Sequence, residues 1–139
     1  MIILSLGSNL HSSFGDRFKN IEAAILYLTT YQIKVIKKSS YYETPSYPDK
    51  EKPKFINIII EVETHLNPED LASVLIYIEE KLERKRKIKN EPRTCDIDII
   101  DYKQQIMTFK YNNLEFEVPH KRLIYRNFVL IPLEEILPK

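Results

Sequence analysis

Residues 55–82 read FINIIIEVETHLNPEDLASVLIYIEEKL, and two patterns in this stretch decide the fold. Residues 55–64 alternate with the two-residue period of a β-strand. One face of that strand would carry Ile56, Ile58, Ile60 and Val62, and the other Phe55, Asn57, Ile59, Glu61 and Glu63. From Pro68 to about Leu82 the apolar residues recur at helical spacing, which predicts an amphipathic helix. The chain therefore combines strands and helices over short distances.

The residues before this stretch predict a strand, a helix, a second strand and a loop. The apolar run at residues 2–6 is typical of a buried strand. Ser13 to Asp16 matches a capping box, so we expect a helix to open there. The apolar stripe of that helix would be Phe18, Ile21, Ile25 and Leu28. Residues 33–44 favour a strand, and the proline-rich residues 45–54 a loop that is long for a compact domain.

The residues after it predict a strand over 95–100, a hairpin over 104–117 turning at Asn112-Asn113, and a helix over 129–136. The resulting order is strand, helix, strand, strand, helix, strand, followed by the hairpin and the short helix. This is the split βαβ pattern of ferredoxin-like folds. We therefore expect an α+β fold with a βαββαβ core, a mostly antiparallel sheet, flanking helices and a C-terminal hairpin. One domain over residues 1–139 suits the length.

Composition narrows the possible functions. The 139 residues are 43% hydrophobic and 29% charged, with a net charge of +1, which argues against a general nucleic-acid binder. We expect no membrane span and no signal peptide, and the single cysteine, Cys95, favours a reducing cytoplasm. Only Gly7 and Gly15 are glycines, so no glycine-rich phosphate loop is possible. Nucleotide phosphates would have to be held by cationic side chains and metal ions.

The segment RTCDIDII at residues 93–100 carries the clearest chemistry. In a strand, Asp96 and Asp98 lie on one face, whereas Cys95 faces the core as a small buried hydrophobe. Two neighbouring carboxylates repel each other, and a divalent cation removes that repulsion. Oxygen ligands of this kind suit Mg²⁺, which binds one or two carboxylates together with substrate phosphates. The alternative is the polar face of a half-buried strand.

Basic residues flank this strand in the sequence. The run at residues 84–89 includes Arg84 and Arg86, and Arg93 precedes the carboxylates. If the helix over 68–82 packs back on the sheet, these arginines converge on one end of it. Arginine forks match phosphate oxygens, so the set indicates phosphoryl transfer. The alternative is an ordinary solvated helix end.

Two further groups are candidates for binding. His120 could bond a phosphate or ribose oxygen, and Arg126 and Phe128 follow it closely. Phe55 and Asn57 fall on one strand face, where a ring and an amide can stack on and read a flat heterocycle. Ordinary packing and a polar surface position are the alternatives for these two residues.

Several short motifs, in this order, resemble the 6-hydroxymethyl-7,8-dihydropterin pyrophosphokinase family. They are Leu6-Gly7-Ser8-Asn9-Leu10, Tyr42-Glu43-Thr44-Pro45, Phe55-Ile56-Asn57, Ile78-Glu79 with Arg84-Lys85-Arg86, Pro92 to Ile99, Val118-Pro119-His120 and Arg126 to Leu130. Each motif is weak alone, but the ordered set spans nearly the whole chain. The family fold is ferredoxin-like, in agreement with the element order.

The resemblance implies that ATP donates pyrophosphate to the pterin hydroxyl and leaves as AMP, in folate synthesis. Asp96 and Asp98 would bind two Mg²⁺ ions and, with Arg84 and Arg93, form the catalytic set. The implied ATP site comprises Glu79, Arg84, Arg86, Arg93, Ile99, His120 and Arg126. The implied pterin site comprises Thr44, Pro45, Phe55, Asn57, Asp96 and Phe128. Residues 10–15, 45–54 and 84–93 would be closing loops, and the enzyme would be a monomer.

Some positions depart from the family pattern. Glu83 replaces the usual glycine before Arg84 and could let the helix run on. Asn90 stands near the usual third-loop aromatic, so the pterin cover is expected either to be absent or to come from elsewhere, with Tyr47 as the candidate. With the ending at Leu137-Pro138-Lys139, we expect lower stability or a trimmed edge, without loss of the site.

Three other functions stay open at this point. A nucleotidyltransferase would share the carboxylates and arginines but attack another phosphorus. A ferredoxin-like RNA-binding module would use the aromatic residues to stack bases. A degenerate relative would bind ligand without turnover, and Glu83 is its main support.

Overall fold

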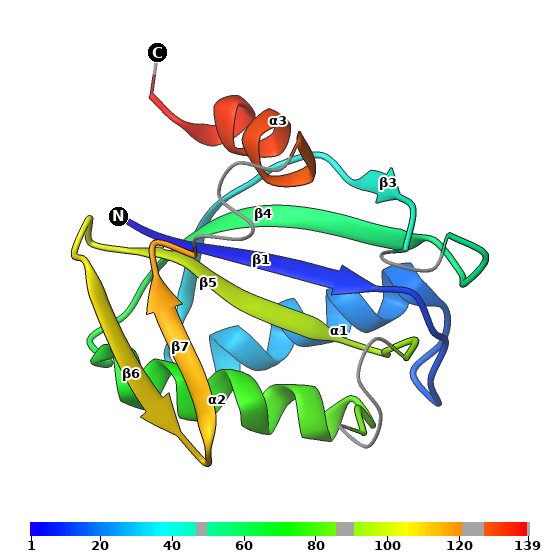
Figure 1. Ribbon diagram of the computed structural model, residues 1–139, viewed down its shortest axis with the longest axis horizontal. Helices are drawn as coiled ribbons and strands as arrows, with labels where there is room; N and C mark the ends of the chain where they lie inside the picture. Colours follow the sequence, from blue (N-terminus) through cyan, green and yellow to red (C-terminus); the bar gives the residue numbers. More distant parts are fainter. Residues whose placement is uncertain (47–49, 86–90, 121–126, 139) are drawn as a thin grey trace.

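The computed structural model describes residues 1–46, 50–85, 91–120 and 127–138, with the side chains of residues 127 and 128 left aside. Figure 1 shows how the described elements are arranged along the chain. The elements are β1 (Ile2–Ser8), α1 (Arg17–Thr30), β2 (Lys34–Lys38), β3 (Tyr42–Thr44), β4 (Phe55–Glu63), α2 (Pro68–Lys81), β5 (Asp96–Tyr102), β6 (Met107–Tyr111), β7 (Leu114–Val118) and α3 (Asn127–Ile136). None of the described helices is long and apolar enough to cross a membrane.

The main sheet has the strand order β2-β4-β1-β5, and β3 pairs with the part of β4 nearest its start. All these pairings are antiparallel. β4 lies between β1 and β2, and β1 lies between β4 and β5, so each βαβ unit has a strand inserted into it. The predicted α+β class is confirmed. β6 and β7 form a separate two-stranded hairpin, whose turn at Asn112-Asn113 is also confirmed, with φ values of 49° and 62°.

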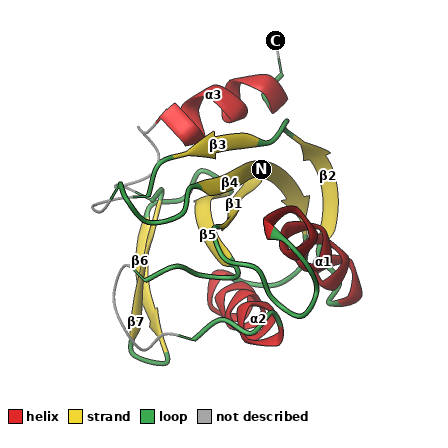
Figure 2. Cartoon of the chain, turned by 90° about the vertical axis from the view of Figure 1, so that its right-hand side faces the viewer, coloured by secondary structure: helices red, strands yellow, loops and turns green. Residues whose placement is uncertain are grey.

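Helices cover both faces of the sheet, as Figure 2 shows from the side. α1 and α2 pack on one face, where the main core includes Leu4, Ile58 and Leu75. α3 packs on the other face over a smaller core that includes Ile59 and Val129. The second layer explains why both sides of β4 are apolar in the middle, since burial of apolar area stabilises each contact.

Capping residues explain where α1 and α2 begin. Asn67 accepts a hydrogen bond from the Asp70 amide at 2.8 Å, and Pro68 is the first residue of α2, as predicted. The capping box predicted at Ser13 is wrong, because α1 begins at Arg17 with Asp16 as the cap. The reason is a tight turn in which the backbones of Ser12 and Gly15 bond each other, so the chain cannot become helical before residue 16.

The strand predicted over residues 33–44 is two strands, β2 and β3. Ser39 breaks it, because its hydroxyl accepts the Ile59 amide at 3.0 Å and its own amide donates to the Ile59 carbonyl at 2.9 Å. The chain then turns toward α3. There Glu135 accepts bonds from the Ser40 amide at 2.7 Å and from the Tyr42 hydroxyl at 3.0 Å. These bonds tie the last helix to the strand that carries Thr44.

α2 ends sharply just before the basic run. The Arg84 amide donates to the Glu79 carbonyl at 3.0 Å and the Glu83 amide to the Glu80 carbonyl at 2.9 Å. Glu83 takes a left-handed backbone with φ of 70°. This is the paired-bond helix ending that normally uses glycine. The expectation that Glu83 lets the helix run on is therefore wrong.

Candidate active site

The two aspartates lie where β5 starts beside the end of β1. Asp96 pairs with Gly7 and Asp98 with Ser5, so both carboxylates lie on the same face of the sheet. Their side chains are 23% and 31% exposed. The predicted alternation is seen as well: Cys95 is fully buried in the main core, and burial raises the pKa of its thiol well above the usual value. Cys95 is therefore a packing residue, as expected.

Both predicted arginines meet at Asp96. Nη1 of Arg84 lies 3.0 Å from Oδ1 of Asp96, and Nη1 of Arg93 lies 3.1 Å from Oδ2. One arginine follows α2 and the other precedes β5, so the end of the helix and the start of the strand converge. Burial opposes the charge of Arg84, but Asp96 and Glu79 outweigh it and raise its pKa above the usual value. The guanidinium stays charged in this setting.

Glu79 anchors the same cluster from inside the protein. Its side chain is 2% exposed. Oε2 accepts bonds from Nη1 of Arg84 and from the Ile97 amide, each at 2.7 Å. A buried carboxylate of this kind needs charged and polar partners, and here it has both. Glu79 therefore joins α2, Arg84 and β5 in one network.

Asp98 lies in a different electrostatic setting. Desolvation raises its pKa well above the usual value, and the carboxylates of Asp96 and Glu79 raise it further, against the opposing effect of the arginines. Nε2 of His120 lies 4.0 Å from Oδ1 of Asp98. The His120 amide donates to the Ile100 carbonyl at 2.9 Å, so the segment after β7 is held against β5. His120 and Asp98 are thus brought together.

A second patch lies beside the arginines, at the start of β4. Asn57 is buried and donates from Nδ2 to the Thr44 hydroxyl at 2.7 Å. A Cβ on Gly7 would lie 2.9 Å from Oδ1 of Asn57, so only glycine leaves room for this amide. The Phe55 ring lies 5.6 Å from the guanidinium carbon of Arg93. An aromatic ring, an amide and an arginine thus share one surface.

Comparison with known proteins identifies the family. Residues 3–138 match the model of 7,8-dihydro-6-hydroxymethylpterin-pyrophosphokinase. The chain belongs to this family. The 2-amino-4-hydroxy-6-hydroxymethyldihydropteridine pyrophosphokinase of Bacillus subtilis (strain 168) is 37% identical over 96% of this chain and 75% of that protein. The enzyme of the same name from Aquifex aeolicus is 34% identical over 99% of this chain and 80% of that protein.

The chain covers a much smaller share of some relatives. The folic acid synthesis protein fol1 of Pneumocystis carinii is 39% identical over 97% of this chain, but the match spans only 17% of that protein. The pyrophosphokinase family can therefore occur as one part of a longer polypeptide.

The two carboxylates at the start of β5 fit a magnesium ion. Asp96 and Asp98 offer only oxygen donors, and the pKa of Asp98 is raised first by desolvation and then by the carboxylates of Asp96 and Glu79. The described residues contain no cluster of three or more His, Cys, Asp or Glu side chains for a metal. A site with two carboxylates suits Mg²⁺, which completes its shell with phosphate oxygens and water. Each oxygen of Asp96 also contacts an arginine, so a metal there would compete with Arg84 and Arg93.

Not every predicted site residue joins this cluster. The side chain of Ile99 is buried in the main core, on the face opposite the aspartates, so only its backbone could meet a ligand. Pro45 is exposed beside Thr44. Arg86 and Arg126 lie outside the described residues, as do Tyr47 and Asn90, and Phe128 belongs to α3 without a described side chain.

Sequence reasoning missed Asn9, which is buried beside the cluster. Its Oδ1 accepts a hydrogen bond from the backbone amide of Arg93 at 2.7 Å, and its backbone amide donates to the Arg93 carbonyl at 3.1 Å. Nδ2 donates to the Pro53 carbonyl at 2.9 Å. The signal in the sequence is a polar residue directly after a buried strand, within the motif Leu6 to Leu10.

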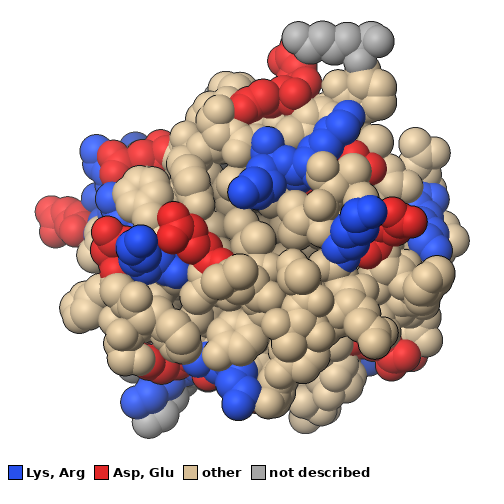
Figure 3. Space-filling model, turned by 180° about the vertical axis from the view of Figure 1, so that it is seen from behind, with Lys and Arg blue, Asp and Glu red and all other residues tan. Residues whose placement is uncertain are grey.

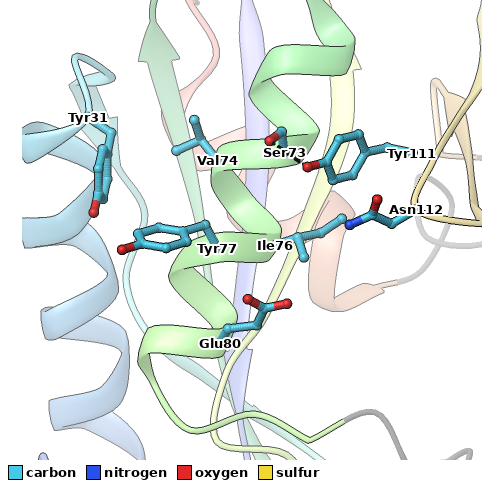
Figure 4. A pocket seen from close by; sticks show the side chains of 8 residues that line it. All are labelled: Tyr31, Ser73, Val74, Ile76, Tyr77, Glu80, Tyr111 and Asn112. Atoms are coloured by element: carbon cyan, nitrogen blue, oxygen red, sulfur yellow. Dashed lines mark hydrogen bonds between the residues drawn. The ribbon is translucent and has the colours of Figure 1, made fainter.

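A pocket of about 240 Å³ lies away from this cluster, along α2 (Figure 4). Its lining is Tyr31, Ser73, Val74, Ile76, Tyr77, Glu80, Tyr111 and Asn112. The Ser73 hydroxyl donates to the Tyr111 hydroxyl at 3.0 Å, and the rings of Tyr31 and Tyr77 meet edge to face. It has a single carboxylate and no arginine, so it lacks the groups that phosphoryl transfer needs.

Proposed function

We propose that this chain transfers pyrophosphate from ATP to 6-hydroxymethyl-7,8-dihydropterin in folate synthesis, as one pyrophosphokinase domain over residues 1–139. The observation that carries the proposal is the meeting of Arg84 and Arg93 at Asp96, with Asp98 beside them. Phosphoryl-type transfer depends on positioning and on compensation of negative charge. Family membership selects the pterin hydroxyl as the acceptor.

In the proposed reaction the hydroxymethyl oxygen forms a bond to the β-phosphorus of ATP. The bond from that phosphorus to the oxygen shared with the α-phosphate breaks, AMP leaves, and the hydroxyl proton is released. Arg84 and Arg93 bind the phosphate oxygens, for which their forks are well matched. In the structure both guanidinium groups contact Asp96, so binding exchanges or shares this carboxylate contact with phosphate.

Asp96 and Asp98 are the residues that would hold Mg²⁺, and we propose two ions. The metal supplies charge neutralisation on the phosphates. This explains how carboxylates can take part in binding a polyanion, because without a cation they would repel it. His120, 4.0 Å from Asp98, is suited to bind a nucleotide oxygen at the same place.

The remaining roles are assigned from position. Phe55 and Asn57 are proposed to stack on and read the pterin, with Asp96, Thr44 and Pro45 beside them and Phe128 from α3. Arg86, Arg126 and the Ile99 backbone are proposed to complete the ATP site. Glu79 contributes to the ATP site indirectly in this scheme, by holding Arg84, because its carboxylate is already bonded to Arg84 and the Ile97 amide.

Two observations favour this enzyme over an RNA-binding module. The described helices cover both faces of the sheet, so its middle is not an open platform for stacked bases. On the face shown in Figure 3, groups of basic side chains lie next to acidic ones around a broad area of other residues, and no continuous basic stripe of described residues crosses this face.

A product assay tests the proposal. The protein is incubated with ATP, 6-hydroxymethyl-7,8-dihydropterin and Mg²⁺, or with EDTA in place of Mg²⁺, and the nucleotides are separated by chromatography. We expect AMP that depends on both the pterin and the metal. ADP or free pyrophosphate as the product would contradict β-phosphorus transfer to the pterin, and undiminished AMP formation in EDTA would contradict the metal requirement.

A further inference from the structure

Glu83 reaches across to the turn that follows β1. Its Oε1 accepts the Ser13 amide at 3.2 Å, and its Oε2 accepts the Ser13 hydroxyl. These bonds lower the pKa of the Glu83 carboxyl below the usual value, with the Ser13 hydroxyl as the main cause. Both oxygens of one carboxylate thus hold both donors of one residue, 70 positions away in the sequence. Water could solvate this exposed carboxylate, so the paired bonds to Ser13 are not needed to satisfy it.

The turn that Glu83 contacts has hydrogen bonds of its own in this structure. The Ser12 amide donates to the Gly15 carbonyl at 2.9 Å, and the Gly15 amide to the Ser12 carbonyl at 3.0 Å. The buried Asn20 contacts the Ser12 hydroxyl at 2.5 Å and donates to the Leu10 carbonyl at 2.8 Å. Because the turn is held by these hydrogen bonds, its contact with Glu83 can restrain the position of the Glu83 side chain.

Glu83 is also directly before Arg84 in the chain. The left-handed backbone of Glu83, with φ of 70°, sets the direction in which Arg84 leaves the helix. A non-glycine residue in this conformation carries an energetic cost, and such strain persists only when surrounding contacts fix it. The two backbone bonds that end α2 provide part of that restraint, and the Ser13 contact adds to it from outside the helix.

The same segment also reaches the second arginine. Asn9 exchanges two hydrogen bonds with the backbone of Arg93, at 2.7 and 3.1 Å. Residues 9–15, which we term the brace, therefore contact the flanks of both arginines that meet at Asp96. Asn9 contacts Arg93 directly, whereas the contact to Arg84 passes through Glu83.

We propose that Glu83 is a positioning residue, which through Ser13 holds the backbone of Arg84 on the brace so that the guanidinium is ready to bind ATP phosphates. This inference rests on the proposed function and adds a residue to it. Preorganisation of this kind lowers the cost of binding more than it speeds the chemical step. Removing the contact should therefore raise the KM for ATP and change kcat little.

The test uses Ser13→Ala, Glu83→Gly, the double variant and the charge-matched control Glu80→Gln. Ser13→Ala is the informative change because it removes the hydroxyl bond to Glu83 without a substitution in α2 or at residue 83, while the Ser13 amide can still bond Glu83. Glu83→Gly relieves the left-handed strain equally with or without Ser13, so comparing the two backgrounds isolates the contact. Amide hydrogen exchange at Arg84 is followed by NMR, together with KM for ATP and kcat.

We expect Ser13→Ala to speed exchange at the Arg84 amide and to raise KM for ATP about three-fold, with kcat changed less than about two-fold. The double variant should raise KM no more than Glu83→Gly does alone, and Glu80→Gln should change neither measurement. Unchanged exchange at Arg84 in Ser13→Ala, or an unchanged KM, overturns the inference. Wild-type protein that forms no AMP would contradict the proposed function instead, and the exchange measurement would still report on the brace.

Discussion

The two ends of the central sheet bury different kinds of group. At the end where β1 stops and β5 starts, the buried side chains include Asn9, Asn57 and Glu79. At the opposite end Ile2 of β1 lies between Val62 and Tyr102. Apolar packing suffices for stability, whereas a buried polar group must be hydrogen-bonded to be tolerated.

The polar end meets this requirement through partners from distant segments. Asn57 is bonded to Thr44, Asn9 to Arg93 and Pro53, and Glu79 to Arg84 and Ile97. Thr94 is different, since its buried hydroxyl has no hydrogen-bond partner among the described residues. We infer that one end of the sheet serves stability and the other serves binding. Substitutions at each end test this division.

The largest effect is expected from Asp98→Asn, at the polar end. Loss of the carboxylate should lower kcat/KM by roughly 10²–10³-fold or more, because compensation of phosphate charge is lost. In metal-free buffer the variant should be more stable than the wild type, since a crowded charge is removed. Both are checked by the AMP assay and by thermal unfolding with and without Mg²⁺. Near-normal turnover would refute the assigned role.

Gly7→Ala is expected to damage the polar end by steric overlap. The new Cβ would lie 2.9 Å from Oδ1 of Asn57, so the amide must shift. We expect a cost of about 1–3 kcal/mol in the free energy of unfolding and a higher KM for the pterin, with KM for ATP nearly unchanged. Urea unfolding and steady-state kinetics measure these effects. A variant in which KM rises for ATP alone would show that Asn57 does not read the pterin.

Val62→Ala tests the apolar end. Val62 is 3% exposed and pairs with Ile2, so truncation should lower the free energy of unfolding by roughly 1–2 kcal/mol. Activity per folded molecule should stay as it is, because the change lies at the end of the sheet away from the carboxylates. Urea unfolding and an active-site titration at low temperature compare the two properties. A large loss of kcat in folded protein would break the division between the two ends.

The smallest effect concerns acid stability at Glu135. Hydrogen bonds from Ser40, chiefly from its side chain, lower the pKa of Glu135 below the usual value. A lowered pKa in the folded state means that the contribution is complete above the unfolded pKa and is lost as the pH falls through the folded pKa. Glu135→Gln should therefore reduce the decrease in Tm between about pH 5 and pH 3, whereas Glu134→Gln should not. An equal decrease in Tm at acid pH in both variants would show that the Ser40 contact does not contribute to stability.

Periodicity was enough to predict most elements but not their ends. The alternation at residues 55–64 and the helical spacing after Pro68 are confirmed as β4 and α2. The predicted start of α1 is wrong because serine is a residue type that often caps helices, whereas Ser13 is hydrogen-bonded to Glu83. Local sequence cannot show that competing long-range contact.

The candidate site shows the same limit. The motif around Asp96 and Asp98 was sufficient to predict carboxylates on one face, and the arginines were expected near them. That both arginines meet one carboxylate depends on how the end of α2 meets the start of β5, which no spacing encodes. The role of Asn9 was missed for the same reason, because its partners are 44 and 84 positions away.

The backbone of Glu83 has a consequence for selection. Glycine at this position would relax the left-handed conformation, so a screen of random variants for heat tolerance alone should favour it. A screen for growth at limiting nucleotide should instead retain glutamate, because the Ser13 contact would matter there. The two screens would enrich different residues at position 83. Their disagreement would show that selection for ATP binding and selection for thermal stability act in opposite directions at this position.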